Sequence, residues 1–506
     1  MKITLLEPPR KAAPDRSNDI ANTTLSACLN SGYAAAVLEK AGHQVRIIEG
    51  YMEGMDWNDV ERSIARSQPE LLAVHMVYNW DDNRELYAFL SKVKEEFGIR
   101  YVAAYGYYPT FAAREILTAC ESIDYILVGE IENTFLDLAS NPNDPVFIQG
   151  LAYRDPYAKR GVRMSMGKLV ANLDDLPFPI RSASSMPGGE VNILGSRGCY
   201  GSCTFCYINP YYGLRGENGE TVGRWRPRSP QNIVDEIDQI SLETGADYFY
   251  FTDPNFYGPG KRGRERVLHL AELLEGRHIR FGIEARANDI EPETIRALKK
   301  AGLQDILVGL ESGRDESLER LGKKTSVADN ERALAVLREN GIEPSVGFIM
   351  FEPDSSLEDL RVNFDFLKRN RLLDRLETAV NVLYHHQIIL QGSPSYNILR
   401  DEGKLILSDH SEYEAETSYE LPGTAAMAEA MRRITNHIFD YMQDTWQLSA
   451  DGDDTIRETY DKISVLLSDS FEKALDLVEH SGPAALEKSD FVQKVNDTVD
   501  RIAGRS

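Results

Sequence analysis

The sequence predicts an α/β protein in three parts: an N-terminal doubly wound (Rossmann-like) domain, a central partial barrel of six βα units and a helical C-terminal domain. Three observations lead to this prediction. Short apolar segments alternate with amphipathic helical segments over residues 1–145, the alternation returns over 187–400, and only helical periodicity is present over 401–506. A chain of 506 residues also exceeds what a single core organises, so several domains are expected.

The N-terminal part contains five strand–helix repeats. Its predicted strands are Lys2–Leu6, Gln44–Ile48, Leu71–Val77, Tyr101–Tyr105 and Tyr125–Val128. Its predicted helices are Ser31–Ala41, Asp56–Arg66, Asn83–Glu96, Ala112–Ala119 and Thr134–Ala139. This rhythm is typical of a parallel sheet that is covered on both faces and binds ligands at the carboxyl ends of its strands.

Residues 146–186 are expected to be a linker. They contain a small hairpin-like piece, Leu151–Arg154 and Lys168–Ala171, followed by the extended segment Asp174–Pro179. Prolines restrict the residues before them to extended conformations, which suits a connection between domains.

The central part has six strand signals: Glu190–Leu194, Tyr248–Thr252, Arg280–Ala285, Asp305–Val308, Ser345–Met350 and Ala379–Leu383. Its predicted helices are Pro230–Glu243, Arg262–Leu274, Glu291–Ala301, Arg314–Leu321, Val327–Asn340 and Leu357–Asn370. In such barrels the functional loops follow the carboxyl ends of the strands. No strand signals are present after residue 400, where helices are predicted over Ala425–Gln447, Thr455–Glu479 and Phe491–Ile502.

The composition narrows the possible partners. With 56 basic and 80 acidic residues the net charge is −24, which disfavours a nucleic-acid partner because the surface repels phosphates. No apolar run approaches the roughly 18 residues of a membrane span, and the N-terminus lacks a signal peptide. Five cysteines do not form a disulfide framework. We therefore expect a cytoplasmic protein without a membrane or nucleic-acid partner.

Three of the cysteines form one short motif. Cys199, Cys203 and Cys206 have the spacing C-x3-C-x2-C and directly follow the first predicted barrel strand. The alternative is a structural zinc site, but zinc requires a fourth protein ligand and no cysteine or histidine lies near in the sequence. Three thiolates suit a [4Fe–4S] cluster that keeps one iron open for chemistry.

The motif, with the aromatic Phe205 before its last cysteine, resembles the signature of the radical S-adenosylmethionine (SAM) superfamily. The resemblance implies that SAM binds the open iron and is cleaved reductively to a 5′-deoxyadenosyl radical. Further segments at successive strand ends are similar to superfamily motifs, including Phe251–Phe256 and Gly347–Pro353, although Phe351 stands where a glycine is usual. The residues implied to contact SAM are Asp253, Glu284, Arg286, Glu311 and Ile349.

The domain that precedes the barrel resembles that of the cobalamin-binding subclass. This resemblance rests on the segments Gly32–Val45 and Asp124–Phe135, whereas the usual D-x-H-x-x-G and G-G-x-H motifs are absent. His75 and His43 are interpreted as structural residues. A version of the domain without corrinoid remains the alternative. The residues implied to line the corrinoid site are Tyr78, Asn79, Trp80, Tyr105, Gly106, Tyr107, Tyr108, Val128, Gly129, Glu130, Glu132 and Thr134.

The resemblance implies a cobalamin-dependent radical SAM methyltransferase that methylates an unactivated carbon of a small biosynthetic intermediate through methylcobalamin. An external electron donor of the flavodoxin or ferredoxin type is expected. Tyr207, His385 and His386 are candidates for acid–base or binding roles, with barrel packing as the alternative for the histidines. Three alternatives are a corrinoid enzyme of rearrangement or cyclisation, a non-catalytic iron–sulfur protein, and a methylthiotransferase, which would need a second three-cysteine set.

Overall fold

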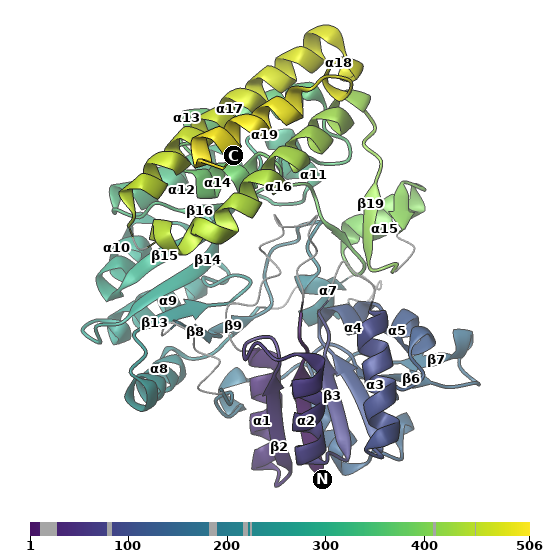
Figure 1. The fold of residues 1–506 in the computed structure, drawn as a ribbon. Coiled ribbons are helices and arrows are strands. Elements are labelled where there is room, and N and C mark those ends of the chain that lie inside the picture. The colour runs from purple at the N-terminus through teal and green to yellow at the C-terminus, as the bar shows by residue number, and fades with distance from the viewer. Residues whose placement is uncertain are drawn as a thin grey trace.

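The computed structural model describes residues 1–10, 28–77, 83–181, 190–215, 221–222, 225–407, 411–450 and 452–505. Figure 1 shows the N-terminal sheet and its helices at one end, the central barrel beside it, and the C-terminal helices at the far end. The N-terminal and central parts meet where the cysteine motif lies, near helix α7 (Ile208–Tyr212).

The N-terminal domain has the predicted doubly wound architecture. Its parallel strands run in the order β2-β1-β3-β4-β5, with α1 and α6 packed on one face and α2, α3 and α5 on the other. The strands are β1 (Lys2–Glu7), β2 (Gln44–Glu49), β3 (Leu71–His75), β4 (Tyr101–Tyr105) and β5 (Tyr125–Leu127). The helices are α1 (Leu29–Lys40), α2 (Trp57–Ser67), α3 (Arg84–Glu96), α4 (Tyr107–Phe111), α5 (Ala113–Ala119) and α6 (Glu132–Ser140).

Part of the expected linker belongs to this sheet. Strands β6 (Leu151–Arg154) and β7 (Val162–Met164) extend it antiparallel beyond β5. The prediction of a second hairpin strand at 168–171 was therefore wrong, as was the description of residues 146–164 as a linker. Leu151 and Ala152 are buried against β5, and this burial makes the segment part of the domain.

Five of the six predicted barrel strands are confirmed. Strands β8, β13, β14, β15 and β16 form one parallel sheet in chain order. They span β8 (Glu190–Ile193), β13 (Tyr248–Phe251), β14 (Arg280–Arg286), β15 (Leu303–Glu311) and β16 (Ser345–Phe348). The helices of this part are α8 (Pro230–Thr244), α9 (Gly260–Leu274), α10 (Pro292–Ala301), α11 (Asp315–Arg320), α12 (Val327–Glu339) and α13 (Leu357–Arg369). Short strands β9 (Ser196–Arg197) and β12 (Arg226–Pro227) pair beside the sheet, and β10 (Leu214–Arg215) pairs with β11 (Thr221–Val222).

Serine residues set the start of three barrel helices. Ser229, Ser326 and Ser356 precede α8, α12 and α13, and each side chain accepts a hydrogen bond from a backbone N–H of the first turn. This capping satisfies a donor that the helix itself leaves without a partner. The predicted helix starts agree with the structure to within two residues because these signals are local.

The sixth predicted strand is a helix. Residues 379–383 fall in α14 (Leu376–Val382) and its end, and the parallel strand position is taken by a single bridge between Phe351 and His386. Phe351 N donates to His385 O at 3.1 Å, and Gln387 N donates to Phe351 O at 2.9 Å. The apolar residues 379–383 predict a strand from their β propensity. In the structure α14 packs against α17, and this tertiary packing overrides the propensity.

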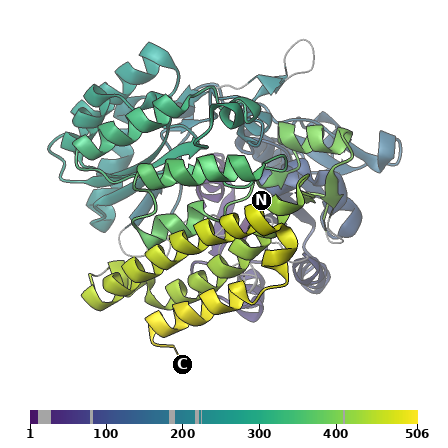
Figure 2. The ribbon, with the colours of Figure 1, turned by 90° about the horizontal axis from the view of Figure 1, so that it is seen from above.

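The C-terminal part contains the three predicted helices and an unpredicted sheet. Strands β17 (Ile389–Leu390), β19 (Glu414–Thr417) and β18 (Leu405–Leu407) pair antiparallel, so the expectation of no strands after residue 400 was wrong. The helices are α15 (Pro394–Asp401), α16 (Pro422–Ala450), α17 (Asp454–Ser481), α18 (Pro483–Glu487) and α19 (Phe491–Ala503). Residues of the barrel and of α16, α17 and α19 share one core, and Figure 2 shows these helices running beside the barrel part.

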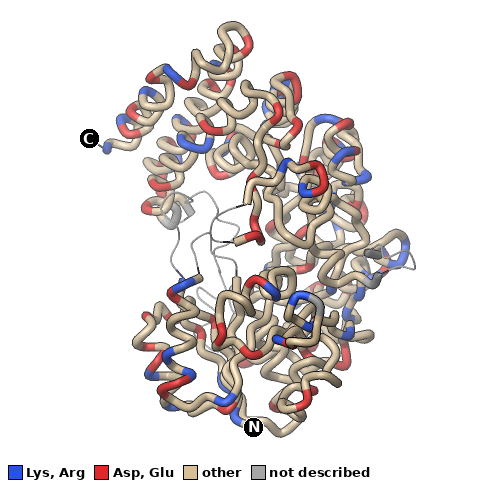
Figure 3. Tube along the Cα trace, turned by 90° about the vertical axis from the view of Figure 1, so that its right-hand side faces the viewer, with Lys and Arg blue, Asp and Glu red and all other residues tan. Residues whose placement is uncertain are grey.

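The outer helices carry mixed charge. Figure 3 shows acidic and basic positions interspersed over the N-terminal and C-terminal helices. Pairs one turn apart, such as Glu458 with Lys462 and Asp490 with Lys494, are exposed and typical of solvated helix faces. Among the described residues, we find no helix with both the length and the apolar character that crossing a membrane requires.

Candidate functional site

The three cysteines of the motif lie on one loop that follows β8 and β9 at the carboxyl edge of the barrel. All three thiols are half-buried. Gly201 N lies 3.3 Å from Cys199 Sγ, and Ile208 N lies 3.5 Å from Cys206 Sγ. The guanidinium of Arg286 lies 3.3 Å from Cys203 Sγ. Backbone N–H groups lie beside two of the sulfurs and a cation lies beside the third, while burial raises the pKa of the Cys199 thiol and raises that of Cys206 to about 12.

The spacing of these thiols separates a cluster from a single metal ion. Tetrahedral zinc holds its sulfur ligands about 3.8 Å apart, because each Zn–S bond is about 2.3 Å long. Among the described residues, the three cysteines do not form a group whose ligand atoms all lie within 4.8 Å of one another. In a [4Fe–4S] cluster each thiolate binds a different iron, so wider spacing is expected. The donor set therefore fits the cube and disfavours the zinc alternative.

Asp253 supports the start of the cysteine loop. It is fully buried, and its carboxylate accepts from Gly195 N at 2.7 Å and from Ser196 Oγ at 2.5 Å. Burial raises the pKa of Asp253 to about 6, against the opposing effect of Arg266. Because both oxygens bind the backbone and side chain that precede the motif, we revise the role expected for Asp253 from contact with SAM to support of the loop.

A second network holds the loop from the other side. Tyr200, between the first two cysteines, donates to Asp289 at 2.5 Å, and Asn255 donates to the same carboxylate at 2.8 Å. The Arg286 guanidinium lies 5.4 Å from the Tyr200 ring centre and also donates to Lys323 O. Sequence reasoning missed this network because its members come from three separate strand ends.

Glu311 and Lys323 form a buried pair at the barrel mouth. Lys323 Nζ lies 2.6 Å from Glu311 Oε1, and Glu311 has a φ of +65°, which is rare and strained for a residue with a Cβ. A Cβ at Gly309 would lie 2.6 Å from Glu311 Oε1 and 2.7 Å from Lys323 Nζ, so a larger residue there would displace the ends of both side chains. Lys323 was not predicted, and its only sequence signal is the run Gly322-Lys323-Lys324 after α11.

The other residues expected to contact SAM gather at the same edge. Glu284 lies at the end of β14 with its carboxylate 3.5 Å from the Tyr250 hydroxyl. Ile349, just after β16, is buried, and its N–H donates to Glu311 O at 2.8 Å. Glu284, Arg286, Glu311 and Ile349 thus lie at one edge of the barrel sheet, and their contact with SAM stays a prediction.

Replacing Glu284 with glutamine is expected to stabilise the protein at pH 8 but not at pH 4. Burial raises the pKa of Glu284 to about 7 from its ordinary 4.5, with Asp253 adding to the effect. The folded state therefore holds its proton more tightly than the unfolded state, and stability is lost as pH rises through this interval. Thermal melts at both pH values test this, with the exposed Glu339→Gln as control. An equal change in melting temperature at pH 4 and pH 8 would contradict the assignment.

Several residues expected to bind corrinoid lie at the carboxyl ends of β4 and β5. Val128 is buried, and Gly129, at φ +77°, donates to Thr110 Oγ1 and accepts from the Tyr211 hydroxyl at 2.6 Å. Thr134 is buried and donates to Gln149 O at 3.2 Å. Tyr78, Asn79 and Trp80 fall outside the described residues.

Glu130 and Glu132 have a different role from the one expected. Glu130 pairs with Arg226 and also accepts from Val170 N at 2.7 Å, while Glu132 pairs with Arg197 at 2.5 Å. All four charged side chains are buried. Since the arginines belong to the segments flanking the cysteine motif, the carboxylates join the two domains, and we revise their expected role accordingly.

The tyrosines at the end of β4 and the start of α4 differ in burial and in their contacts. Tyr105 is fully buried with its hydroxyl 2.7 Å from Ser31 Oγ, and Tyr108 is buried with its ring 4.9 Å from that of Tyr413. Both side chains are enclosed by protein, and their expected contact with a corrinoid stays a prediction. Tyr107 is half-buried, and its ring lies 4.9 Å from Tyr207 and 4.4 Å from Tyr211. Gly106 has a φ of +123° and its missing Cβ leaves room for the His75 ring.

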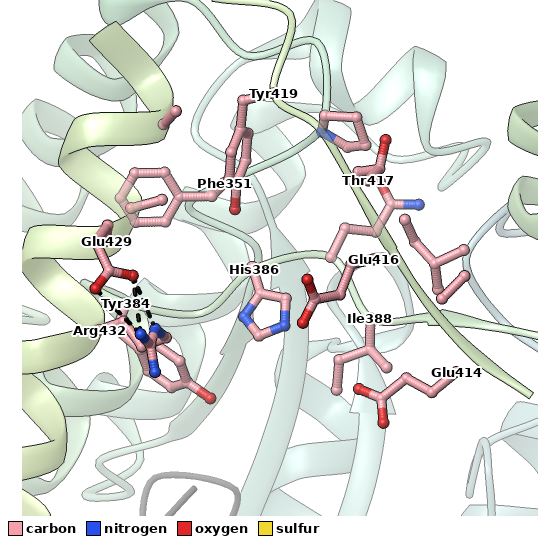
Figure 4. A pocket seen from close by; sticks show the side chains of 16 residues that line it. Phe351, Tyr384, His386, Ile388, Glu414, Glu416, Thr417, Tyr419, Glu429 and Arg432 are labelled. Carbon is pink, nitrogen blue, oxygen red and sulfur yellow. Dashed lines mark hydrogen bonds and ion pairs between the residues drawn. The ribbon is translucent and has the colours of Figure 1, made fainter. Parts of the chain in front are cut away.

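Two cavities adjoin these groups. One, of about 830 Å³, lies between the cysteine loop and the N-terminal domain and is lined by Cys203, Cys206, Thr110, Phe111 and Met166 among others. The other, of about 490 Å³, is lined by His386, Phe351 and the C-terminal sheet and helix α16. Figure 4 shows His386 beside Glu416, with Glu429 and Arg432 paired on α16 at 2.9 Å.

The three candidates for acid–base or binding roles do not share one cavity wall. Tyr207 follows Cys206 and packs on Tyr107, and burial raises the pKa of its hydroxyl. His386 lines the smaller cavity, whereas His385 contributes its carbonyl to the bridge with Phe351. Their chemical roles remain predictions.

Comparison with known proteins matches the central part of the chain to a family model. The radical SAM superfamily model matches residues 193–367. The chain is 26% identical over 381 residues to an uncharacterized methyltransferase of Pyrococcus horikoshii, covering 73% of this chain and 78% of that protein. It is 30% identical over 252 residues to the 4′-phospho-dehydrooxetanocin synthase of Priestia megaterium, covering 45% of this chain but only 32% of the synthase.

A solved structure has the same fold. It is that of OxsB, a cobalamin-dependent SAM radical enzyme with aqua-cobalamin and SAM bound. The TM-score is 0.75 at 20% identity, over 99% of this chain and 75% of that one. The chain thus contains a radical SAM domain, which implies a [4Fe–4S] cluster and SAM as its cofactors, within the fold of a cobalamin-dependent radical SAM enzyme.

Proposed function

We propose that this radical SAM protein is a cobalamin-dependent methyltransferase that transfers a methyl group to an unactivated carbon of a small molecule. The supporting observation is the cavity of about 830 Å³ that opens on Cys203 and Cys206 on one side and on Thr110 and Phe111, beyond β4, on the other. In both folds ligands bind at the carboxyl ends of the strands, so the cavity joins the two expected cofactor positions.

When bound, the cluster and SAM supply a carbon-centred radical, and the corrinoid supplies a methyl group. The chain's own residues orient and enclose these groups. Cys199, Cys203 and Cys206 hold the cluster, and Arg286 fixes the loop through Cys203 and Lys323 O. The Glu311–Lys323 pair presents polar atoms toward the space that Gly309 leaves open. The surrounding burial keeps competing hydrogen donors away from the radical and so prevents side reactions.

The smaller cavity is the proposed substrate side. It lies beside the bridge between Phe351 and His386, at the carboxyl edge of the barrel, and β19 and α16 close it. Its volume of about 490 Å³ and its mixture of aromatic and polar walls suit a small organic molecule. Glu414, Glu416 and Arg432 were not foreseen because they belong to segments without motif character.

A second function has one observation in its favour. The synthase of Priestia megaterium, 30% identical over its matched part, is not named a methyltransferase. A corrinoid radical SAM enzyme that rearranges or cyclises its substrate therefore stands as the second candidate. The product mass separates the two, since methyl transfer adds one methylene and rearrangement does not.

The proposed function is tested with anaerobically reconstituted protein, SAM and dithionite. Formation of 5′-deoxyadenosine is expected, and its absence would leave a non-catalytic iron–sulfur protein. Gel filtration after incubation with hydroxocobalamin tests the corrinoid directly. If the corrinoid elutes free of protein, the cofactor assignment fails while the cluster assignment stands. Replacing dithionite with a flavodoxin or ferredoxin tests the expected electron donor.

Replacing Lys323 with methionine is expected to weaken SAM binding about tenfold or more. The substitution leaves the nearly buried Glu311 carboxylate without its cation. Removing one partner of a buried ion pair costs several times the free energy that an exposed ion pair contributes. Calorimetric titration of SAM into the cluster-loaded protein measures the effect. Lys324→Met is the matched control, because Lys324 is the exposed neighbour. Equal losses in both variants would show that Glu311 and Lys323 do not form part of the SAM site.

A further inference from the structure

Three donor side chains of the N-terminal domain converge away from the cysteine motif. They are Glu7, Cys28 and His75, and one ligand atom from each lies within 4.8 Å of the others. Glu7 and His75 are buried, and Cys28 is half-buried. The proposed function assigns no role to this cluster, and a thiol, an imidazole and a carboxylate together are a common donor set for transition metals.

The cluster lies at the point of the sheet where a ligand is expected. Glu7 ends β1, His75 ends β3, and Cys28 stands immediately before α1. In the strand order β2-β1-β3-β4-β5 the connections change direction between β1 and β3. Doubly wound sheets of this order bind their ligands at that switch point.

Two of the distances within the cluster lie near those around a tetrahedral ion. Cys28 Sγ lies 3.5 Å from His75 Nδ1, and His75 Nδ1 lies 2.9 Å from Glu7 Oε2. A tetrahedral zinc with bonds of about 2.3 Å to sulfur and 2.0 Å to nitrogen and oxygen places sulfur about 3.5 Å from nitrogen and nitrogen about 3.3 Å from oxygen. Shifts of about half an ångström would therefore bring the sulfur–nitrogen and nitrogen–oxygen distances to those of a zinc site.

Surrounding groups hold the ligands in place. Ser31 Oγ donates to Glu7 Oε1 at 2.5 Å, and the Tyr105 hydroxyl lies 2.7 Å from Ser31 Oγ. A Cβ at residue 106 would lie 3.0 Å from Cδ2 and 3.1 Å from Nε2 of His75, so Gly106 permits the observed ring position. At protein metal sites, residues that contact the ligands from outside hold carboxylates and imidazoles in a fixed orientation.

We infer that Glu7, Cys28 and His75 bind one zinc ion, with a fourth position that these three residues do not fill. Three protein ligands with an open position are typical of zinc sites that bind a further molecule. Without the ion the same residues form an ion pair, in which Glu7 also faces Arg10 at 3.4 Å. The inference involves neither SAM nor the cysteine motif, but the cluster shares its sheet edge with Tyr105 and Gly106, which are expected to line the corrinoid site.

The test uses the full-length protein with its iron–sulfur cluster loaded anaerobically. Metal analysis is expected to give one zinc per chain in addition to the cluster iron, and Cys28→Ser and His75→Gln are expected to lower the zinc content at least tenfold. Replacement of zinc by Co²⁺ is expected to give a thiolate-to-cobalt charge-transfer absorption that Cys28→Ser lacks. Cys120→Ser is the matched control, because Cys120 is the other free cysteine of this domain and is buried in a separate core.

Iron content and thermal melts show whether the variants are folded. Added zinc is expected to raise the melting temperature of the wild type and of Cys120→Ser, but not of Cys28→Ser. The inference is overturned if folded wild type takes up no zinc and no Co²⁺. It is also overturned if Cys28→Ser and His75→Gln keep both metals, or if only substitutions in the cysteine motif release them.

Discussion

Replacing Cys203 with alanine is expected to abolish the iron–sulfur absorbance and to reduce 5′-deoxyadenosine formation to background. Cys203 is one of three thiols on the loop, and its sulfur is the one that Arg286 contacts, at 3.3 Å. Without it, two thiolates remain for a cluster that needs three, and the Arg286 cation loses the group it compensates. The loss should be complete, because SAM cleavage requires the cluster and no described residue replaces the missing ligand at that position. Iron analysis and chromatography of the nucleoside measure the two effects.

The control for this prediction is Cys120→Ala. Cys120 is buried in the N-terminal core, so its substitution removes a thiol without touching the loop. It is expected to keep the cluster and the cleavage. Arg286→Met provides an intermediate case, in which the three thiols remain but the loop loses its tie to Lys323 O. Cleavage by Cys203→Ala at the wild-type rate would place the cluster elsewhere and remove the basis of the proposed function.

Local patterns made the N-terminal sheet and most of the barrel predictable. Each strand from β1 to β5 is a short apolar run between amphipathic helices, and the predicted and observed bounds differ by at most two residues. The sixth barrel strand failed because residues 379–383 have β-branched composition but pack as a helix on α17. The strands β18 and β19 were missed because each is short and half exposed, so its sequence lacks a core pattern.

The candidate site also has a part that the sequence predicted and a part that it did not. The three cysteines and the residues at the strand ends were predictable, since a motif of fixed spacing carries their position. The roles of Asp253, Glu130 and Glu132 were not, because each depends on a partner distant in sequence, such as Arg226 for Glu130. A carboxylate in a motif predicts a contact with a ligand. Only the folded structure shows that an arginine distant in the sequence is its partner. The sequence offered Arg197 and Arg226 only as neighbours of the cysteine motif.

Replacing Arg226 with methionine is expected to destabilise the junction between the two domains by about 3–5 kcal/mol, the usual cost of removing one partner from a buried ion pair. The Glu130 carboxylate would stay buried, with Arg197 at 3.5 Å as the one cation left beside it among the described residues. Arg226→Met combined with Glu130→Gln should recover much of this loss, because the second change removes the uncompensated charge while keeping the hydrogen-bonding shape. Thermal melts and limited proteolysis measure the effect. Arg264→Met is the control, since its partners Glu291 and Glu293 are exposed and such pairs contribute at most about 1 kcal/mol. Equal stability of Arg226→Met and Arg264→Met, or a double variant weaker than the single one, would show that charge compensation at Glu130 does not hold the domains together.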